Sequence, residues 1–159
     1  MPESSVQFAI ATHILVALAY RGKEGCGSAM LAGSVNADPS FVRKSVSLLA
    51  KAGLVKTTRG KHGSTRLAVP PANITLRDVS RAVGYPSVGL SHQYTACRLC
   101  PVSVNLRGSL RRIETAMDTA ILKTLAQVTI AQLAADVRRQ AGIEAGHRTP
   151  CRGSFRRRR

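Results

Sequence analysis

Apolar positions near the N-terminus recur with the period of an amphipathic helix. Hydrophobic residues follow one another every three or four positions from Ile10 to Leu18, and this pattern predicts a helix that ends near Tyr20. Ser4 and Gln7 have the spacing of a capping box, in which two side chains satisfy unpaired backbone groups at a helix start. The first helix is therefore expected to begin at Ser4.

Two further helices are predicted before residue 54. Ser28 is expected to cap a short second helix over 29–35. The turn that follows ends in Asp38 and Pro39, an N-cap residue and the residue favoured at the first helical position. A third helix is therefore expected to start there and to end at Gly53. Two helices joined by a tight turn are typical of a helix-turn-helix.

Two short strand-like stretches around a glycine-bearing turn predict a β-hairpin next. Residues 54–59 and 64–69 are expected to form its strands, and 60–63, with a glycine at each end, its turn. Thr75 and Asp78 then mark the start of another short helix. A hairpin that directly follows a helix-turn-helix corresponds to the wing of a winged helix-turn-helix.

The longest helical pattern runs over 101–127. Its apolar residues have the four–three–four spacing of a coiled-coil seam: Leu106, Leu110, Ile113 and Met117. An apolar stripe that faces the core of the same chain would show the same spacing, but a helix of this length is longer than so small a domain can cover. We therefore interpret it as the dimer interface between two copies of the chain. Thr129 and Gln132 are expected to cap a last helix that ends near residue 139.

The composition limits the chain to one compact, mainly α domain. Of its 159 residues, 44% are hydrophobic and only 4% are aromatic, so the core must be built from aliphatic side chains. The expected organisation is a winged helix-turn-helix domain over 1–84, a sensor loop over 85–100, dimerisation helices over 101–139 and a disordered basic tail over 140–159.

The chain is strongly basic, with 24 lysines and arginines against 8 acidic residues and a net charge of +16. Six of the arginines follow Gly146, and without them the net charge is still about +10. The folded part therefore carries its own positive charge, which favours a nucleic-acid partner over a merely solvated surface. The longest apolar run, over 9–19, suits neither a bilayer span nor a signal peptide, so we expect a cytoplasmic protein without membrane contact.

One side of the third predicted helix has the composition of a DNA-reading surface. Val42, Val46 and Leu49 form its apolar side. The opposite side holds only hydroxyl groups and cations: Ser40, Arg43, Lys44, Ser47 and Lys51. A solvated surface helix would ordinarily carry carboxylates as well. This side is therefore predicted to lie in the major groove of DNA.

The turn of the predicted hairpin is also basic. Arg59, Lys61 and His62 cluster there between two glycines, where they could follow phosphates or enter a minor groove. An ordinary charged hairpin remains an equal alternative for this feature alone. Ser28, at the start of the second helix, completes the set of predicted DNA contacts.

Several longer stretches form a recognisable series. They are LAKAGLV, RGKHG followed by RLAVPPANITLRDVSRAV, CPV at the start of the long helix, and VTIAQLAADV. This series spans about residues 6–137 and resembles the Rrf2 family of bacterial winged helix-turn-helix regulators. The resemblance implies a dimer formed through the long helix and a palindromic operator. It also implies that positions 40, 43 and 44 face DNA bases and that Arg59 enters the minor groove. In the wing, Ser64 and Thr65 replace the glycine and aromatic residue usual in the family.

The loop before the long helix holds Cys97 and Cys100. Cluster-binding members of the Rrf2 family carry three cysteines in this loop, so two disfavour an iron–sulfur cluster, and we expect neither a cofactor nor a metal site. A thiol at a helix start is more readily ionised. We therefore predict that the pair senses an oxidant or an electrophile, with inert loop cysteines as the alternative. Cys26 is expected to be a packed core residue.

These observations predict a sequence-specific transcriptional repressor and not an enzyme. The sequence contains no glycine-rich phosphate loop, paired carboxylate site or Ser-His-Asp arrangement. Two alternatives remain open: an iron–sulfur-cluster-sensing regulator of the same fold, and a basic RNA-binding protein. Preference for one palindromic duplex over random duplex and RNA would separate the repressor from the RNA-binding protein.

Overall fold

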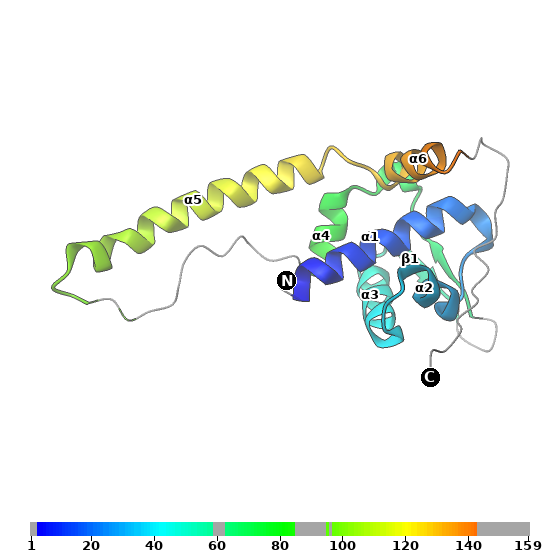
Figure 1. Ribbon diagram of the computed structural model, residues 1–159, viewed down its shortest axis with the longest axis horizontal. Coiled ribbons are helices and arrows are strands. Elements are labelled where there is room, and N and C mark those ends of the chain that lie inside the picture. The colour runs from blue at the N-terminus through cyan, green and yellow to red at the C-terminus, as the bar shows by residue number, and fades with distance from the viewer. Residues whose placement is uncertain (1–2, 59–62, 85–94, 96, 143–159) are drawn as a thin grey trace.

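The structure, a computed structural model, describes residues 3–58, 63–84, 95 and 97–142. These residues form a mainly helical fold with a small two-stranded sheet and a long helix near its C-terminal end, as the sequence predicts (Figure 1). In order, the elements are α1 (Glu3–Arg21), a 3₁₀ turn (Gly22–Glu24), α2 (Ser28–Val35), α3 (Pro39–Lys51), β1 (Val55–Thr57), β2 (Thr65–Leu67), a second 3₁₀ turn (Pro71–Asn73), α4 (Leu76–Val83), α5 (Pro101–Leu125) and α6 (Ile130–Gln140).

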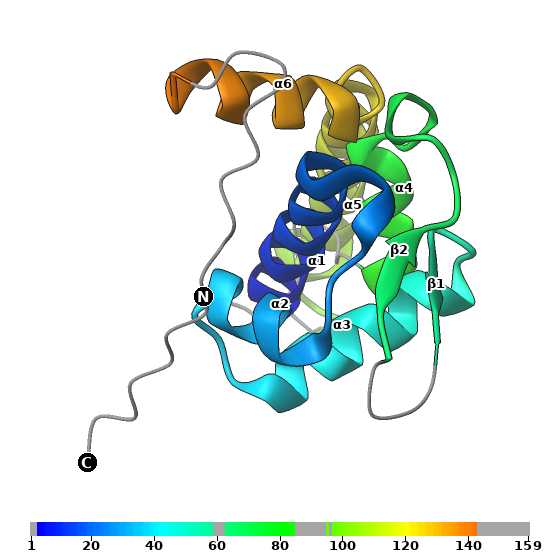
Figure 2. The same ribbon diagram turned by 90° about the vertical axis from the view of Figure 1, so that its right-hand side faces the viewer.

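Helix α1 lies at the centre of the core. It contacts α2, α3, α4, α6 and strand β2, so each of these elements is positioned against the same helix (Figure 2). Its residues Ile14, Leu15 and Leu18 are fully buried. The other elements contribute buried aliphatic side chains to the same cluster: Leu31, Val42, Leu49, Val55, Ile74, Val79 and Ile130.

A buried polar contact joins α1 to α3. The predicted capping box is wrong, because α1 begins at Glu3 and Gln7 lies more than a turn inside it. The Gln7 side chain is buried and its Nε2 donates a hydrogen bond to Oγ of Ser45, which is also fully buried. The Ser45 hydroxyl in turn donates to the Phe41 carbonyl at 2.9 Å. An aliphatic pair would not fix the rotation of α3 so closely, since hydrogen bonds are directional.

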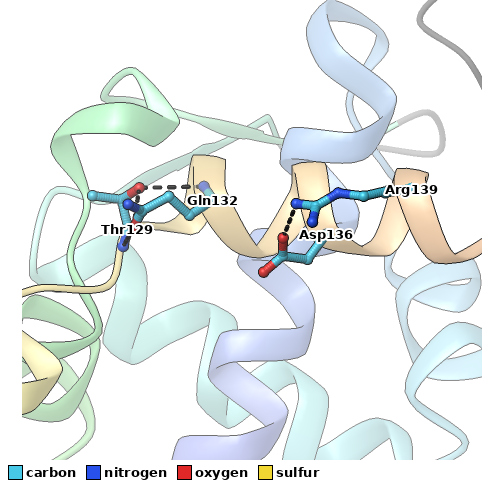
Figure 3. Close-up of polar contacts among 4 residues, drawn as sticks. All are labelled: Thr129, Gln132, Asp136 and Arg139. Carbon is cyan, nitrogen blue, oxygen red and sulfur yellow. Dashed lines mark hydrogen bonds and ion pairs between the residues drawn. The ribbon is translucent and has the colours of Figure 1, made fainter.

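The other predicted helix boundaries agree with the structure except at α2. Thr75 with Asp78 and Thr129 with Gln132 both form complete capping boxes, the second of which is drawn in Figure 3. Burial by itself would raise the pKa of Asp78, but the hydrogen bonds from Thr75 and the charges of Arg77 and Arg81 together lower this pKa. At α2, Gly27 occupies the N-cap position in extended conformation without a side-chain bond, so the predicted cap at Ser28 is wrong.

The hairpin is shorter than expected. Regular pairing is limited to Val55–Thr57 and Thr65–Leu67, in antiparallel register with Lys56 opposite Arg66. An isolated bridge extends the sheet on its other side, because Cys26 and Thr65 exchange backbone hydrogen bonds of 2.9 and 2.8 Å. Residues 59–62, which include most of the predicted turn, lie outside the described part of the chain.

Helix α5 projects away from the body, and its C-terminal end is anchored (Figure 1). The backbone N–H of Leu76 donates to the Val128 carbonyl, and that of Ile130 to the Ile74 carbonyl, each at 2.9 Å. Helix α6 then lies along α1 and buries Ile130 and Ala134. The core thus extends beyond residues 1–84 to include α6 of the same chain. None of the helices in the described residues combines the length and apolar character needed to cross a membrane.

Candidate nucleic-acid interface

The outer side of α3 has the predicted polar composition. All five residues assigned to it are exposed: Ser40, Arg43, Lys44, Ser47 and Lys51. On the inner side, Val42 and Leu49 are buried and Val46 is half-buried, so the predicted division of the helix is confirmed. The inner side is not purely apolar, because the buried Ser45 lies on it and is hydrogen-bonded to Gln7.

The N-terminus of α3 is held by Asp38. Its carboxylate accepts hydrogen bonds from the backbone N–H of Ser40, at 2.8 Å, and from the Ser40 hydroxyl. These bonds lower the pKa of Asp38, and the guanidinium of Arg43 adds a smaller lowering. The cap remains ionised near neutral pH and keeps the first turn of α3 ordered. The Ser40 hydroxyl can still accept a hydrogen bond from a base while it donates to Asp38.

The start of α2 lies beside the outer side of α3. A hollow of about 260 Å³ separates α2, α3 and the two strands, and Ser28, Arg43 and Ser47 contribute to its lining. Thr57 and Thr65 line the strand side of the same hollow. Three predicted contact residues from two helices therefore lie around one concave surface beside the wing.

The strands add two cations that the sequence analysis did not assign to the interface. Lys56 and Arg66 are exposed and directly opposite each other in the antiparallel ladder. Like charges at opposed positions repel each other and destabilise a sheet unless an anion lies nearby. Only the pairing register brings them together, since ten positions separate them in the sequence. The predicted turn residues Arg59, Lys61 and His62 lie outside the described residues.

Gly25 allows the loop after α1 to approach the wing. Its φ is +69°, in the left-handed region. A Cβ at this position would lie 2.7 Å from Cγ of Arg66 and 3.0 Å from the Thr65 carbonyl oxygen. The neighbouring Cys26 is buried, as expected for a packed core residue, and its backbone pairs with Thr65. The wing is therefore fastened to the loop that joins α1 to α2.

The two loop cysteines lie at the other end of the molecule. Cys100 is the N-cap residue of α5, and Cys97 is exposed. The backbone N–H of Cys100 donates to the Cys97 carbonyl at 3.1 Å, while the N–H of Cys97 donates to Oγ of Ser103 at 2.9 Å. Figure 1 shows this end of α5 remote from α3 of the same chain. Within the described residues, no group of three or more His, Cys, Asp or Glu side chains could hold a metal ion.

The sequence matches one protein family over residues 4–136, the Rrf2 family, which is described as iron-dependent transcriptional regulators. The chain belongs to the Rrf2 family. It is accordingly a transcription regulator and not an enzyme. Among curated proteins it is similar to YwnA of Bacillus subtilis, assigned as an HTH-type transcriptional regulator, with 30% identity over 124 residues, which are 78% of this chain and 91% of YwnA.

Solved structures of Rrf2 proteins have the same fold. A transcriptional regulator from Lactobacillus plantarum superposes with a TM-score of 0.73 at 25% identity, covering 84% of this chain and 90% of that one. IscR of T. potens gives 0.63 at 20% identity, covering 88% and 90%. CymR, the global cysteine regulator of B. subtilis, gives 0.57 at 24% identity, covering 82% and 94%. The last two likenesses show the fold alone.

Replacement of Gly25 by alanine should destabilise the protein more than replacement of Gly22. Both glycines have a positive φ, of +69° and +67°, which strains an alanine; Gly25 also has a ψ of 178°, a combination that only glycine readily adopts, at a cost of about 1–3 kcal/mol. A Cβ at Gly22 meets nothing within 4 Å, whereas one at Gly25 overlaps the strand at Thr65 and Arg66. Urea unfolding of both variants would measure the difference. Equal losses of unfolding free energy would show that Gly25 is not needed for the approach of the wing.

Proposed function

We propose that this Rrf2 protein is a homodimeric repressor that binds a palindromic operator, with one α3 helix in each of two major-groove half-sites. The observation that supports this most is the exposed side of α3, on which every assigned residue is a hydrogen-bond donor or a cation. The carboxylate nearest its N-terminus, Asp38, is occupied as the helix cap. The five assigned residues themselves include no carboxylate, and this composition favours the approach of phosphates and base edges.

The individual residues would divide between base and backbone contacts. Ser40, Arg43 and Lys44 occupy the first turns of α3, which reach furthest into a groove when such a helix docks. Ser47 and Lys51 lie further along and would contact the backbone. Ser28 at the start of α2 and the opposed cations Lys56 and Arg66 would contact phosphates on either side of α3. Bound phosphate would also relieve the repulsion between those two cations.

An exposed apolar series along α5 supports the dimer. Val102, Leu106, Ile113 and Met117 are between 40% and 64% exposed, and Leu110, in the same series, is half-buried. So many large apolar side chains in one stripe are uncommon on a monomer. A second copy of α5 would cover them, and the two-fold symmetry of such a pair explains a palindromic operator.

Arg43→Ala should lose discrimination at one base pair in each half-site, by about 1–3 kcal/mol for a bidentate contact. The operator would first be selected from a random duplex pool with the purified protein, and affinities would then be measured by fluorescence anisotropy at fixed salt. Arg139→Ala is the matched control, since Arg139 is exposed on α6, on the opposite side of the body from α3 (Figures 1 and 2).

Random duplex that competes as well as the selected duplex would contradict the repressor proposal. Tighter binding of RNA than of any duplex would favour the RNA-binding alternative. Both comparisons need fixed moderate salt, because a net charge of +16 binds any polyanion when salt is low.

Ile113→Asp should prevent dimer formation. An aspartate in the centre of the proposed seam would place two carboxylates against each other in an apolar interface, where unpaired charge is strongly destabilising. Analytical ultracentrifugation at micromolar concentration would measure the oligomeric state, and circular dichroism would check that helices remain. Thr115→Asp, an exposed residue of α5 outside the apolar series, is the control. A wild-type chain that sediments as a monomer would exclude this interface.

We further propose that Cys97 and Cys100 form a redox switch in the cytoplasm. The hydrogen bond between their backbones closes a four-residue turn, and the ends of such a turn are near enough for a disulfide. Peroxide would oxidise the two thiols to a disulfide and be reduced to water. The product would constrain the start of α5, close to the dimer seam. No third ligand accompanies the pair in the described residues, so a thiol reaction is favoured over an iron–sulfur cluster.

Peroxide should weaken operator binding by the wild-type protein, and dithiothreitol should restore it. Cys97→Ser and Cys100→Ser should both be insensitive if a disulfide forms. Insensitivity of Cys100→Ser alone would indicate modification of a single thiol instead. Equal operator affinity of the wild type in reduced and oxidised states would contradict the switch.

A further inference from the structure

A second concave site is lined by residues of α1, α2 and α6. Its volume is about 580 Å³, within the range of pockets that bind small molecules. The walls are mostly apolar and include Val16, Ala17, Leu31 and Leu133. Among the described residues, none of the predicted DNA contacts and neither loop cysteine contributes to them. This pocket, called the α1–α6 pocket below, is therefore separate from both sites discussed above.

One end of the α1–α6 pocket holds an arginine whose donors are poorly satisfied. Nη1 of Arg21 lies 2.8 Å from Sδ of Met30, a weak acceptor. Nη2 forms a long ion pair of 3.5 Å with Glu24, whose side chain is half exposed. Nε is buried and has no hydrogen-bond partner among the described residues. A guanidinium has five N–H donors. This one can therefore donate hydrogen bonds to a ligand carboxylate and lose only weak existing contacts.

The other polar groups of the pocket do not compete for the same ligand group. His13 is hydrogen-bonded to Oγ of Ser34 at 2.9 Å, and partial burial lowers its pKa, which keeps the ring uncharged near neutral pH. Asp136 accepts a hydrogen bond from Arg139 on the same helix (Figure 3). Arg21 is thus the lining residue whose positive charge is available to an anion.

The lining includes residues of α2 and one residue that is bonded to the wing, the two elements beside α3. Met30, Leu31 and Ser34 belong to α2, the first helix of the helix-turn-helix. Cys26 lines the pocket and its backbone pairs with Thr65 of the wing. A molecule between α2 and α6 would therefore press on the two elements that flank α3.

We propose that the α1–α6 pocket binds a small apolar carboxylate and that this binding changes the affinity of the protein for DNA. The apolar body of the ligand would lie between Val16, Leu31 and Leu133, and its carboxylate would accept hydrogen bonds from Arg21 in place of Glu24. The regulatory half of this proposal depends on the DNA-binding function proposed above, whereas the binding half does not.

Calorimetric titration of the full chain without DNA tests the binding half. The probes are octanoate, decanoate and phenylbutyrate, each below its micelle concentration, and the neutral amide of decanoate is the control ligand. We expect one saturable site per chain for at least one carboxylate and weaker binding of the amide. Failure of all three carboxylates to bind would overturn the proposal. Equal affinity for decanoate and its amide would overturn the role of Arg21.

Ligand binding by substituted proteins tests whether the carboxylate occupies the α1–α6 pocket. Arg21→Gln should weaken carboxylate binding about ten- to a hundredfold, the range expected for hydrogen bonds to a charged group, and leave the amide unaffected. Arg107→Gln, at an exposed position of α5 outside the lining, is the matched control. Ala17→Trp should fill the pocket and abolish binding, while Ala135→Trp, on the exposed side of α6, should not. Undiminished binding by both Arg21→Gln and folded Ala17→Trp would place the ligand elsewhere, for example at the α5 seam between two copies.

The regulatory half is tested by operator titrations with and without saturating decanoate. We expect the operator dissociation constant to change at least severalfold in the wild type and to stay constant in Ala17→Trp. Carboxylate binding with an unchanged operator affinity would overturn the coupling but not the site. Absence of specific DNA binding in every condition would overturn the repressor proposal, while the calorimetric result would still stand.

Discussion

The burial of α1 is the constraint on which the rest of the fold depends. One helix of 19 residues provides the common surface for α2, α3, α4 and α6. Complete burial of an aliphatic side chain such as Leu15 contributes about 1.5–3 kcal/mol, and α1 supplies several of them. With only 4% aromatic residues in the chain, the core depends on aliphatic side chains of this kind. Helix α3, the proposed DNA-reading helix, is therefore positioned from inside the domain, by its contacts with α1.

Polar contacts refine what apolar burial alone leaves open. Aliphatic packing sets how close α3 lies to α1 but restrains its rotation weakly. The bond from Gln7 to Ser45 selects one rotation, and this rotation exposes the side that carries Arg43 and Lys44. On the other side of the hollow, the Cys26–Thr65 bridge restrains the wing relative to the loop after α1. Both restraints begin at or near α1, so a displacement of that helix would affect both halves of the interface.

The contacts around α1 offer two ways in which a change elsewhere in the molecule could alter the position of α3. Helix α5 joins the body where the backbones of Ile74 and Leu76 bond to the segment after it, so movement of α5 is transmitted to α4 and α6. The α1–α6 pocket acts from a different direction, through α2 and the wing. The proposed thiol switch and the proposed ligand site would therefore influence α3 independently, and both depend on how firmly α1 holds it.

Local signals in the sequence determined the helices, most of their ends and the polar side of α3. Asp38-Pro39, Thr75 with Asp78 and Thr129 with Gln132 act within one helical turn, so their effect does not depend on distant residues. Tertiary structure decided the rest, since it required contacts between residues far apart in the chain. Gln7 was predicted to pair with Ser4, but its buried Nε2 donates to Ser45, 38 positions away, because burial makes an unpaired donor costly. Strand register alone placed Lys56 opposite Arg66, and the pocket with Arg21 at its end arose only when α6 folded back onto α1.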